Sequence, residues 1–540
     1  MNNISIIFEE ELKSFHGELQ QIVGEFDMSD NISTGKEEYE QFLSDIKQIF
    51  ESKANDDSFL SILKNRTQLG LLPKVEKNWG DAIHTRYDHS VGVTAKCIVV
   101  CAYLNSKAKD DTLKLAEQEI RELALAAALH DVGHLPVSHA VERAFLSCSE
   151  YKKDDVTHEA RIIPMLLGGS HPLFKNLFDK ISEWNHFDKV HSIRRAAYLI
   201  SEDETEKYVS KLHEFKYPKK VLQQLLSSEI DMDRLDFILR DAEKLKYAPV
   251  TLIRDKILCF IKGLSLRSTY STRKNIENNV ELCIDFDYIP YIFMFLVSRL
   301  LMYKNCYFSQ EVRAFEGMLT YIVSEFLRYG PKPNSEELME YFDEFFCYDY
   351  LMQRVDFLPD DDKVIKDKES ISTQEHIRKL VQAIKENKTN RYKYLYSIDL
   401  KNPEEKIKPR LKDELELEFN NHAYINEIKE KIIKSSQNIN IRRGEFLIDV
   451  FSIKEGEGNF LVSEKHEKIE EDGQGKEIKK IVEEIKLLND YMNGSNIHRL
   501  YTKKRLDFYY KSDLSPQKID NIKKIIENFF YVVNTKQAIQ

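Results

Sequence analysis

One stretch of the chain, residues 119–145, constrains the fold more than any other. It reads EIRELALAAALHDVGHLPVSHAVERAF. Its first half predicts a helix with an apolar face broad enough to be buried. That helix carries His130 and Asp131 into the interior, where an imidazole beside a carboxylate is costly unless a metal or hydrogen bonds satisfy both groups.

The same stretch continues with further ionisable groups. Gly133 breaks the helix and His134 follows it; after Pro136 a second helix begins, with His139 and Glu142 on one face at i, i+3. Three histidines and two acids therefore fall within 13 positions. A helix break with satisfied core histidines is the simpler alternative, but so many groups at one helix end favour a metal-centred active site.

Two residues elsewhere can complete such a site. His89 stands at the start of an apolar helix predicted over 90–104, and Asp233 lies on a helix predicted over 229–242. With His130 and Asp131 they form a set of two imidazoles and two carboxylates. This set suits a divalent ion such as Mn²⁺, Fe²⁺, Zn²⁺, Ni²⁺ or Mg²⁺, and four ligands leave room for water and substrate.

The composition excludes some classes of protein. The 540 residues suffice for two to four domains, and a net charge of -11 argues against a broad electrostatic grip on nucleic acid. The seven cysteines contain no CxxC pair and are typical of reduced cytosolic thiols. No repeat, P-loop or Rossmann glycine pattern is found.

The sequence predicts a cytoplasmic protein that does not span a membrane. The first residues are acidic and lack a signal-peptide pattern. The most apolar run, residues 288–303, is interrupted by Arg299 and is predicted to be too short to span a membrane.

Helical spacing predicts one or two helices in residues 1–50, for packing or an oligomer surface. The other predicted helices lie at 59–70 with Gly70 as C-cap, at 335–346, 374–385 and 517–533, and from 157 onward with Thr157 as N-cap. Strands are predicted at 445–452, 459–463, 498–502 and 507–511, and a charged surface loop at 465–480. The sequence allows two interpretations of Arg86 and two of the tyrosines near Arg299. Arg86 could bind phosphate or cap acidic neighbours, and the tyrosines near Arg299 could be functional or core residues.

Taken together, these motifs resemble those of the HD-domain deoxynucleoside triphosphate (dNTP) triphosphohydrolases. The matching segments, in chain order, are Gln68–Gly70, His84–Ser90, His130–His139, Thr157–Glu159, Asp231–Asp241, and Arg299 with Tyr303 and Tyr307 at four-residue spacing. The likeness covers most of the chain, more loosely in its C-terminal half. Three features depart from the family's pattern: Phe237 stands where Tyr is usual, Tyr303 stands where His is common, and residues 243–249 (EKLKYAP) lack the glycine that is usual after Arg240 and Asp241.

The resemblance implies a role for each site residue. The metal ligands would be His89, His130, Asp131 and Asp233. The groups serving the phosphates and the leaving group would be His134, His139 and His158, with His139 the general acid, oriented by Glu142. The triphosphate would be held by Arg86, Arg234 and Arg299. The sugar 3′ hydroxyl would be read by Gln68 and Asp241, with Leu69 beneath the sugar and Tyr307 excluding a 2′ hydroxyl. The remaining predicted substrate contacts are Phe237 and Tyr303.

We therefore expect a mainly α fold: an N-terminal helical segment at 1–50, an HD-domain core at 51–330 and a smaller α+β C-terminal lobe at 331–540. The expected reaction is metal-dependent hydrolysis of dNTPs to deoxynucleoside and triphosphate, for dNTP pool control or antiphage defence. Expected partners are the dNTP substrate, an allosteric nucleotide effector, and further copies of the chain in a dimer, tetramer or hexamer. The alternatives are an HD nucleotidase, a cyclic-dinucleotide or alarmone hydrolase, and a nucleotide-sensing or nucleic-acid-binding protein.

Overall fold

A computed structural model describes residues 4–531 of the chain, apart from several short segments. The segments outside the description are 51–58, 76–78, 80–81, 149, 152–155, 169–170, 185–187, 210–214, 270–278, 332, 334–337, 340, 342, 344–345, 359–372, 387–390, 401–405, 419–420, 436–444, 453–460, 472–476 and 488–503. For residues 4–6, 451–452, 461–471, 477–487 and 504, the backbone alone is described.

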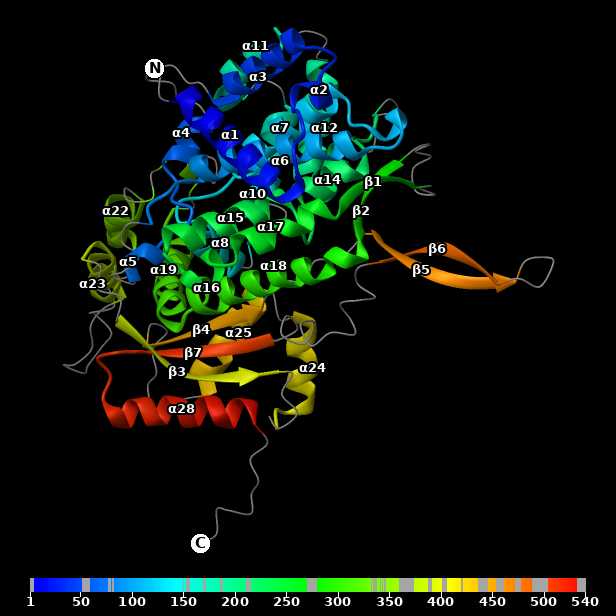
Figure 1. The fold of residues 1–540 in the computed structure, drawn as a ribbon. Helices are drawn as coiled ribbons and strands as arrows, with labels where there is room; N and C mark the ends of the chain where they lie inside the picture. The colour runs from blue at the N-terminus through cyan, green and yellow to red at the C-terminus, as the bar shows by residue number, and fades with distance from the viewer. Residues whose placement is uncertain are drawn as a thin grey trace.

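Helices dominate the first 330 residues. They are α1 Ile4–Val23, α2 Ser29–Ile32, α3 Lys36–Phe50, α4 Phe59–Lys64, α5 Leu72–Val75, α6 Arg86–Lys107, α7 Glu117–Leu129, α8 His139–Leu146, α10 His158–Leu167, α11 Lys175–Ile181, α12 Lys189–Ile200, α13 Glu202–Val209, α14 Lys220–Leu226, α15 Met232–Lys244, α16 Ala248–Thr251, α17 Arg254–Lys262, α18 Ile289–Met302 and α19 Gln310–Tyr329. Figure 1 shows them as one mass, in which α6 and α7 lie among the other helices. Every residue of α7 from Ile120 to Leu129 is buried, as its apolar composition predicts.

A smaller α+β part lies below this mass in Figure 1. Its strands, β3 Tyr392–Asp399, β4 Phe446–Ser452 and β7 Lys504–Lys511, form an antiparallel sheet in the order β3-β7-β4. Two helices from this half of the chain, α22 Leu351–Arg354 and α23 Thr373–Lys385, pack on the main helical core instead. Helices α24 Pro409–Glu418, α25 His422–Ser435 and α28 Pro516–Phe530 complete the α+β part. Residues such as Ile428, Phe508 and Ile526 give it a hydrophobic cluster of its own. The predicted fold class, mainly α with a smaller α+β C-terminal region, is confirmed.

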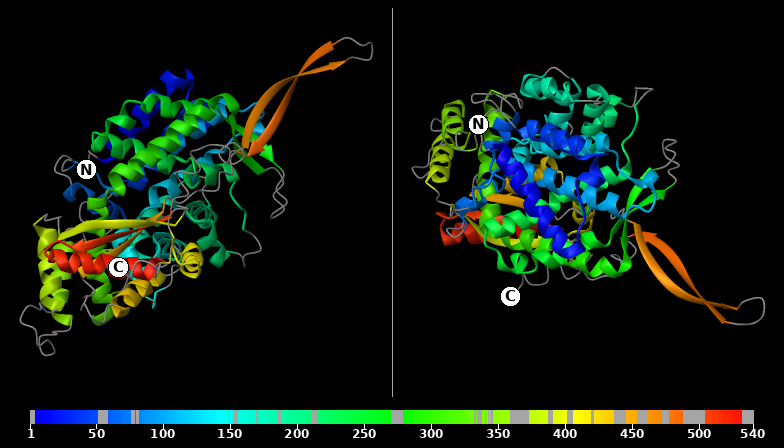
Figure 2. Two further views of the ribbon diagram at one scale, coloured as in Figure 1. Left: turned by 90° about the horizontal axis from the view of Figure 1, so that it is seen from below. Right: turned by 45° about the horizontal axis from the view of Figure 1, so that its top comes forward.

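A second sheet joins distant parts of the chain. β1 Leu264–Thr269 pairs antiparallel with β2 Asn279–Asp285, and β2 pairs parallel with β5 Leu461–Glu471. β5 then forms a long antiparallel hairpin with β6 Glu477–Leu487. The hairpin projects from the body of the molecule in every view (Figures 1 and 2).

Several predicted elements are confirmed, including the helices at 90–104, 374–385 and 517–533 and the strands at 445–452 and 507–511. Others are corrected. The N-terminal segment holds three helices. The helix predicted at 59–70 ends at Lys64. Gly70 lies in a separate turn with φ 54°, so it is not the C-cap of that helix. Residues 465–471 and 477–480 of the predicted loop lie instead in strands β5 and β6, which pair antiparallel with each other. The strand predicted at 498–502 and most of the helix at 335–346 lie outside the described residues.

The apolar run around α18 is longer than the sequence predicted. A 3₁₀ turn precedes α18 and a π-helical turn follows it, so the helical segment extends over 22 residues, from Phe286 to Tyr307. By length and composition it is the one helix in the described part of the chain that could cross a membrane, a test that core helices also pass. Its Ile292, Phe295 and Met302 belong to the main hydrophobic core.

Candidate metal and catalytic site

The four predicted metal ligands converge from three helices. His130 and Asp131 lie in the turn after α7, His89 in the first turn of α6 and Asp233 in the first turn of α15. The Nε2 atom of His89 lies 2.9 Å from Asp233 Oδ1 and 3.8 Å from Asp131 Oδ2. The Nε2 atom of His130 lies 3.5 Å from Asp131 Oδ1 and 3.6 Å from Asp233 Oδ1. We call these four residues the His-Asp cluster.

Helix caps fix two of these side chains. Thr85 caps α6: its hydroxyl accepts from the amide of Asp88, and the carboxylate of Asp88 accepts from the amide of Thr85 in return. Asp231 caps α15 by accepting from the amide of Arg234 at 2.7 Å. Because a satisfied first turn holds its backbone rigidly, each helix presents its ligand in a set direction.

The residues present fit a divalent ion. His130 Nδ1 lies 2.7 Å from the carbonyl of Ala127, so this nitrogen carries the hydrogen and Nε2 offers a lone pair to the cluster. That Nε2 atom is buried and has no hydrogen-bond partner among the described residues. Burial alone would lower the pKa of His89, but the carboxylates of Asp233 and Asp236 outweigh burial and raise it to about 10. The cluster therefore attracts positive charge.

Asp236 is the residue of this site that the sequence reasoning missed. Its Oδ2 atom accepts from His89 Nδ1 at 2.8 Å, which leaves Nε2 of His89 facing the cluster. Lys96 Nζ lies 2.7 Å from its Oδ1, and Arg240 Nε lies 2.9 Å from its Oδ2. Arg240 pairs with Glu11 of α1 as well as with Asp236. The available signal was the spacing: Asp236 lies one turn after Asp233 and one turn before Arg240.

A second cluster adjoins the first through His134. Its Nε2 atom lies 3.2 Å from Asp131 Oδ1, and its ring stacks on that of His158 at 4.0 Å. Glu142 lies 3.6 Å from His134 Nδ1 and 3.4 Å from His139 Nδ1, and its carboxylate also accepts from Arg161 at 2.8 Å. Burial alone would raise the pKa of Glu142, but its histidine neighbours hold it well below its usual range.

His139 differs from its neighbours in exposure. Its side chain is 66% exposed, whereas those of His134 and Glu142 are 3% and 11% exposed. His158 lies at the start of α10, capped by Thr157 as predicted, and burial followed by the charge of His134 lowers its pKa to about 4. Of the three predicted catalytic histidines, His139 is thus the most exposed, and its Nδ1 atom lies beside the carboxylate of Glu142.

A close backbone approach joins these two clusters. A Cβ atom placed on Gly133 would come within 2.0 Å of the carbonyl oxygen of His158 and 2.7 Å of its carbon. Glycine at 133 therefore allows the turn after α7 to contact the start of α10, which brings His158 over His134.

The predicted sugar contacts gather around Asp241. Tyr307 donates to Asp241 Oδ2 at 2.5 Å, and His84 Nε2 lies 2.7 Å from Oδ1. Phe237 packs edge-on against Tyr307 at 6.3 Å, and its ring lies 6.5 Å from that of His89. The sequence predicted no role for His84, although His84 opens the matched segment His84–Ser90 that contains His89.

The remaining predicted contacts lie at the edges of the site. Leu69 is buried, and Gln68 holds a buried amide oxygen that no described residue contacts by a hydrogen bond. The ring of Tyr303 lies 5.2 Å from that of Tyr307, with the Arg299 guanidinium 5.6 Å from the Tyr303 ring.

The three predicted phosphate-binding arginines are all engaged with carboxylates. Arg86 donates to Asp131 Oδ2 at 2.5 Å and to Ser138 Oγ at 3.0 Å. The other two pairs are Arg234 with Asp231 and Arg299 with Glu229. Any phosphate group that binds these arginines must therefore share them with, or displace them from, these acids.

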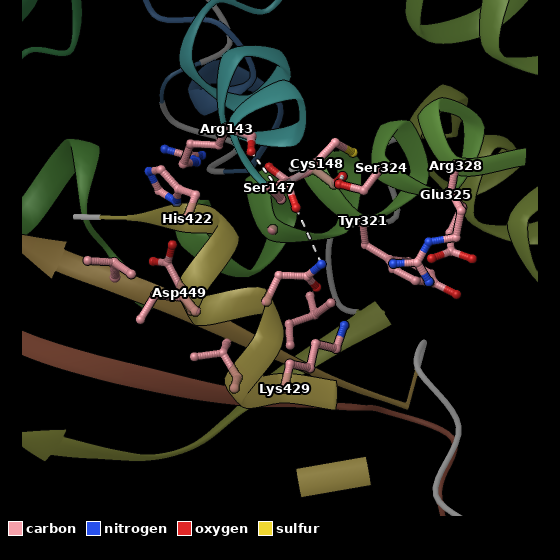
Figure 3. A pocket seen from close by; sticks show the side chains of 17 residues that line it. Arg143, Ser147, Cys148, Tyr321, Ser324, Glu325, Arg328, His422, Lys429 and Asp449 are labelled. Atoms are coloured by element: carbon pink, nitrogen blue, oxygen red, sulfur yellow. Dashed lines mark hydrogen bonds between the residues drawn. The ribbon is translucent and has the colours of Figure 1, made fainter. Parts of the chain in front are cut away.

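A separate cavity of about 90 Å³ lies at the other end of α8, between α8, α19, α25 and β4 (Figure 3). Its charges are largely matched: Arg143 pairs with Glu316 at 2.8 Å, and Asp449 with Arg313. His422 lines it as well; burial, then the charge of Arg143, lowers the pKa of His422 to about 4. The cavity marks the contact between the helical part and the C-terminal lobe.

Comparison with known proteins agrees with this geometry. Residues 86–246 match the HD domain family, and this range contains all four residues of the His-Asp cluster. Residues 86–246 are thus similar to HD domains over the segment that holds this cluster.

Several curated proteins are similar over part of the chain. The uncharacterized protein MG461 homolog of Mycoplasma pneumoniae is 28% identical over 252 residues, which cover 45% of this chain and 48% of that protein. The putative HD domain-containing protein L394 of Acanthamoeba polyphaga mimivirus is 25% identical over 286 residues, covering 49% and 52%. The chain thus spans about half the length of these relatives. A crystal structure of a phosphohydrolase from Bacteroides thetaiotaomicron has a TM-score of 0.49 and 20% identity, covering 89% of this chain and 96% of that one.

Proposed function

We propose that this protein is an HD-domain phosphohydrolase that converts dNTPs to deoxynucleoside and inorganic triphosphate. The observation that carries the proposal is the contact between the two clusters. Asp131 of the His-Asp cluster lies 3.2 Å from His134, and Glu142 links His134 to the accessible His139. A metal-binding set beside an accessible imidazole suits hydrolysis of a phosphate ester with a poor leaving group.

A divalent ion held by His89, His130, Asp131 and Asp233 would polarise the α-phosphate and lower the pKa of water. A water oxygen would bond to the α-phosphorus and release a proton to solvent, and the bond from phosphorus to the sugar 5′ oxygen would break. His139 gives its proton to that oxygen, since an alkoxide leaves poorly. Glu142, whose carboxylate lies 3.4 Å from His139 Nδ1, would orient the imidazole.

The residues around Asp241 support a sugar lacking the 2′ hydroxyl. With its two oxygens held by Tyr307 and His84, the carboxylate of Asp241 has a fixed direction and can accept from a 3′ hydroxyl. Tyr307 lies beside it and would occupy the space of a 2′ hydroxyl. This exclusion would be steric, because dNTPs and ribonucleotides share the 3′ hydroxyl and differ only by the hydroxyl at the 2′ carbon.

The test is product analysis. Each dNTP is incubated with Mn²⁺ or Mg²⁺, with and without a second nucleotide, and the products are separated by chromatography and ³¹P NMR. Triphosphate with an equal amount of deoxynucleoside is expected. Asp131→Ala serves as the inactive control. Release of phosphate from a monophosphate, or opening of a cyclic dinucleotide, with no triphosphate from any dNTP would replace the proposal by another HD phosphohydrolase activity.

A further inference from the structure

The turn that presents His139 has an unusual backbone. Val137 and Ser138, which directly precede it, have φ values of 55° and 45°. L-residues rarely adopt such angles, and a β-branched residue such as valine does so least readily. Two consecutive strained residues persist only where their surroundings hold them, so the contacts of this turn identify what holds it.

A carboxylate from a distant part of the chain contacts the turn. Asp343 Oδ1 accepts from the amide of Val137 at 2.9 Å, over 206 positions of sequence. Its Oδ2 accepts from both the amide and the hydroxyl of Thr67, each at 2.9 Å. Asp343 thus ties the turn before His139 to the segment that precedes Gln68 and Leu69.

Arg66 strengthens the same connection. Its side chain is buried, and it donates to the carbonyl of His134 at 3.4 Å and to the carbonyls of Met339 and Tyr341. The guanidinium also lies 3.9 Å from Asp343 Oδ1. Asp343 and Arg66 therefore connect Met339, Tyr341 and Asp343 to the turn before His139 on one side and to Thr67 on the other.

We propose that Asp343 is a positioning residue: by holding the Val137–Ser138 turn against Thr67, it fixes His139 relative to Gln68 and Leu69. Asp343 lies outside the matched residues 86–246, so the HD domain alone lacks this support. The inference rests on the proposed role of His139, and it adds a residue from beyond the HD domain to the working site.

The substitution Asp343→Asn tests it. The amide keeps the size of the side chain but presents NH₂ to one of the donors that the carboxylate satisfied. In a crystal structure of the variant, Val137 and Ser138 should return to negative φ. The kcat for triphosphate release should fall roughly ten- to a hundredfold, since a displacement of about 1 Å costs that order of rate, with metal content unchanged. The matched control is Asp349→Asn, an exposed aspartate six positions away.

A rescue separates positioning from general damage. Glycine adopts positive φ without strain, so Val137→Gly added to Asp343→Asn should restore much of the lost kcat. Thr67→Val removes one of the three donors to Asp343 and should give a smaller loss in the same direction, which covers the case where Asp343→Asn does not fold.

Positive φ retained at both residues in the Asp343→Asn crystal structure would overturn the inference, as would a relaxed turn with unchanged kcat. Absence of triphosphate release from the wild-type protein would refute the proposed function alone, because the φ values are measured without turnover.

Discussion

Replacing Gly133 by alanine tests whether the two clusters depend on one backbone contact. The added Cβ atom would lie 2.0 Å from the carbonyl oxygen of His158, whereas ordinary contacts begin at 3.4 Å. The difference requires the turn after α7 and the start of α10 to separate by about 1.4 Å. Since the obstructing atoms belong to the backbone, no side-chain rotation relieves the clash.

Both stability and activity should respond. Overpacking of a dense interior destabilises a protein by about 1–3 kcal/mol. In the wild-type protein the rings of His158 and His134 stack at 4.0 Å, and the separation would move the two rings apart. A misplacement of about 1 Å at a reacting centre lowers the rate about 10²-fold. Urea unfolding measures the first effect, and triphosphate release at saturating dNTP measures the second.

Gly17→Ala is the matched control. Gly17 lies inside α1 and a Cβ there meets nothing within 4 Å, so alanine should stabilise the helix by about 0.5–1 kcal/mol and leave turnover unchanged. A Gly133→Ala protein with wild-type stability and wild-type kcat would refute the reasoning, because it would mean that the site tolerates separation of its two halves.

Four further outcomes are expected. Asp131→Ala should lose bound metal and turnover with the fold kept, measured by elemental analysis and circular dichroism; full activity without metal would contradict the ligand assignment. His139→Ala should keep metal and lower kcat about 10²–10⁴-fold; a change confined to KM would make it a binding group. Tyr307→Ala should raise the ribonucleotide-to-dNTP ratio of kcat/KM, and an unchanged ratio would make Tyr307 a core residue. For His422, whose pKa is lowered from 6.5 to about 4, the unfolded chain binds the proton more readily, so stability is full above pH 6.5 and falls towards pH 4. His422→Gln should remove that part of the loss, at most about 3 kcal/mol, in unfolding curves at the two pH values.

The His-Asp cluster could be predicted because its ligands sit at fixed places relative to helix ends. His130 and Asp131 follow an apolar helix, His89 follows the cap Thr85, and Asp233 follows the cap Asp231. Local rules of helix capping and burial are enough to place such residues.

Residues whose partners lie far along the chain could not be predicted. Asp343 contacts Val137 and Thr67 across more than 200 positions, and no periodicity in the sequence signals such a pair. The charged, glycine-containing segment at 465–480 predicts a surface loop; the pairing of residues 465–471 with 477–483 depends on a partner strand that the local pattern does not reveal. The carboxylate partners of the arginines could not be predicted either, because Arg299 contacts Glu229 only after the segments that carry them have packed together.

The parallel pairing of β2 with β5 has a consequence for how the chain is made. Synthesis proceeds from the N-terminus, so Cys283 and Ile284 leave the ribosome long before their partners Leu461 and Val462 exist. Throughout that interval one edge of β2 offers unpaired amides and carbonyls to any other strand. Nascent or truncated chains that stop near residue 330 would keep this edge open permanently, and we expect them to aggregate unless a chaperone or a separately supplied C-terminal fragment covers it.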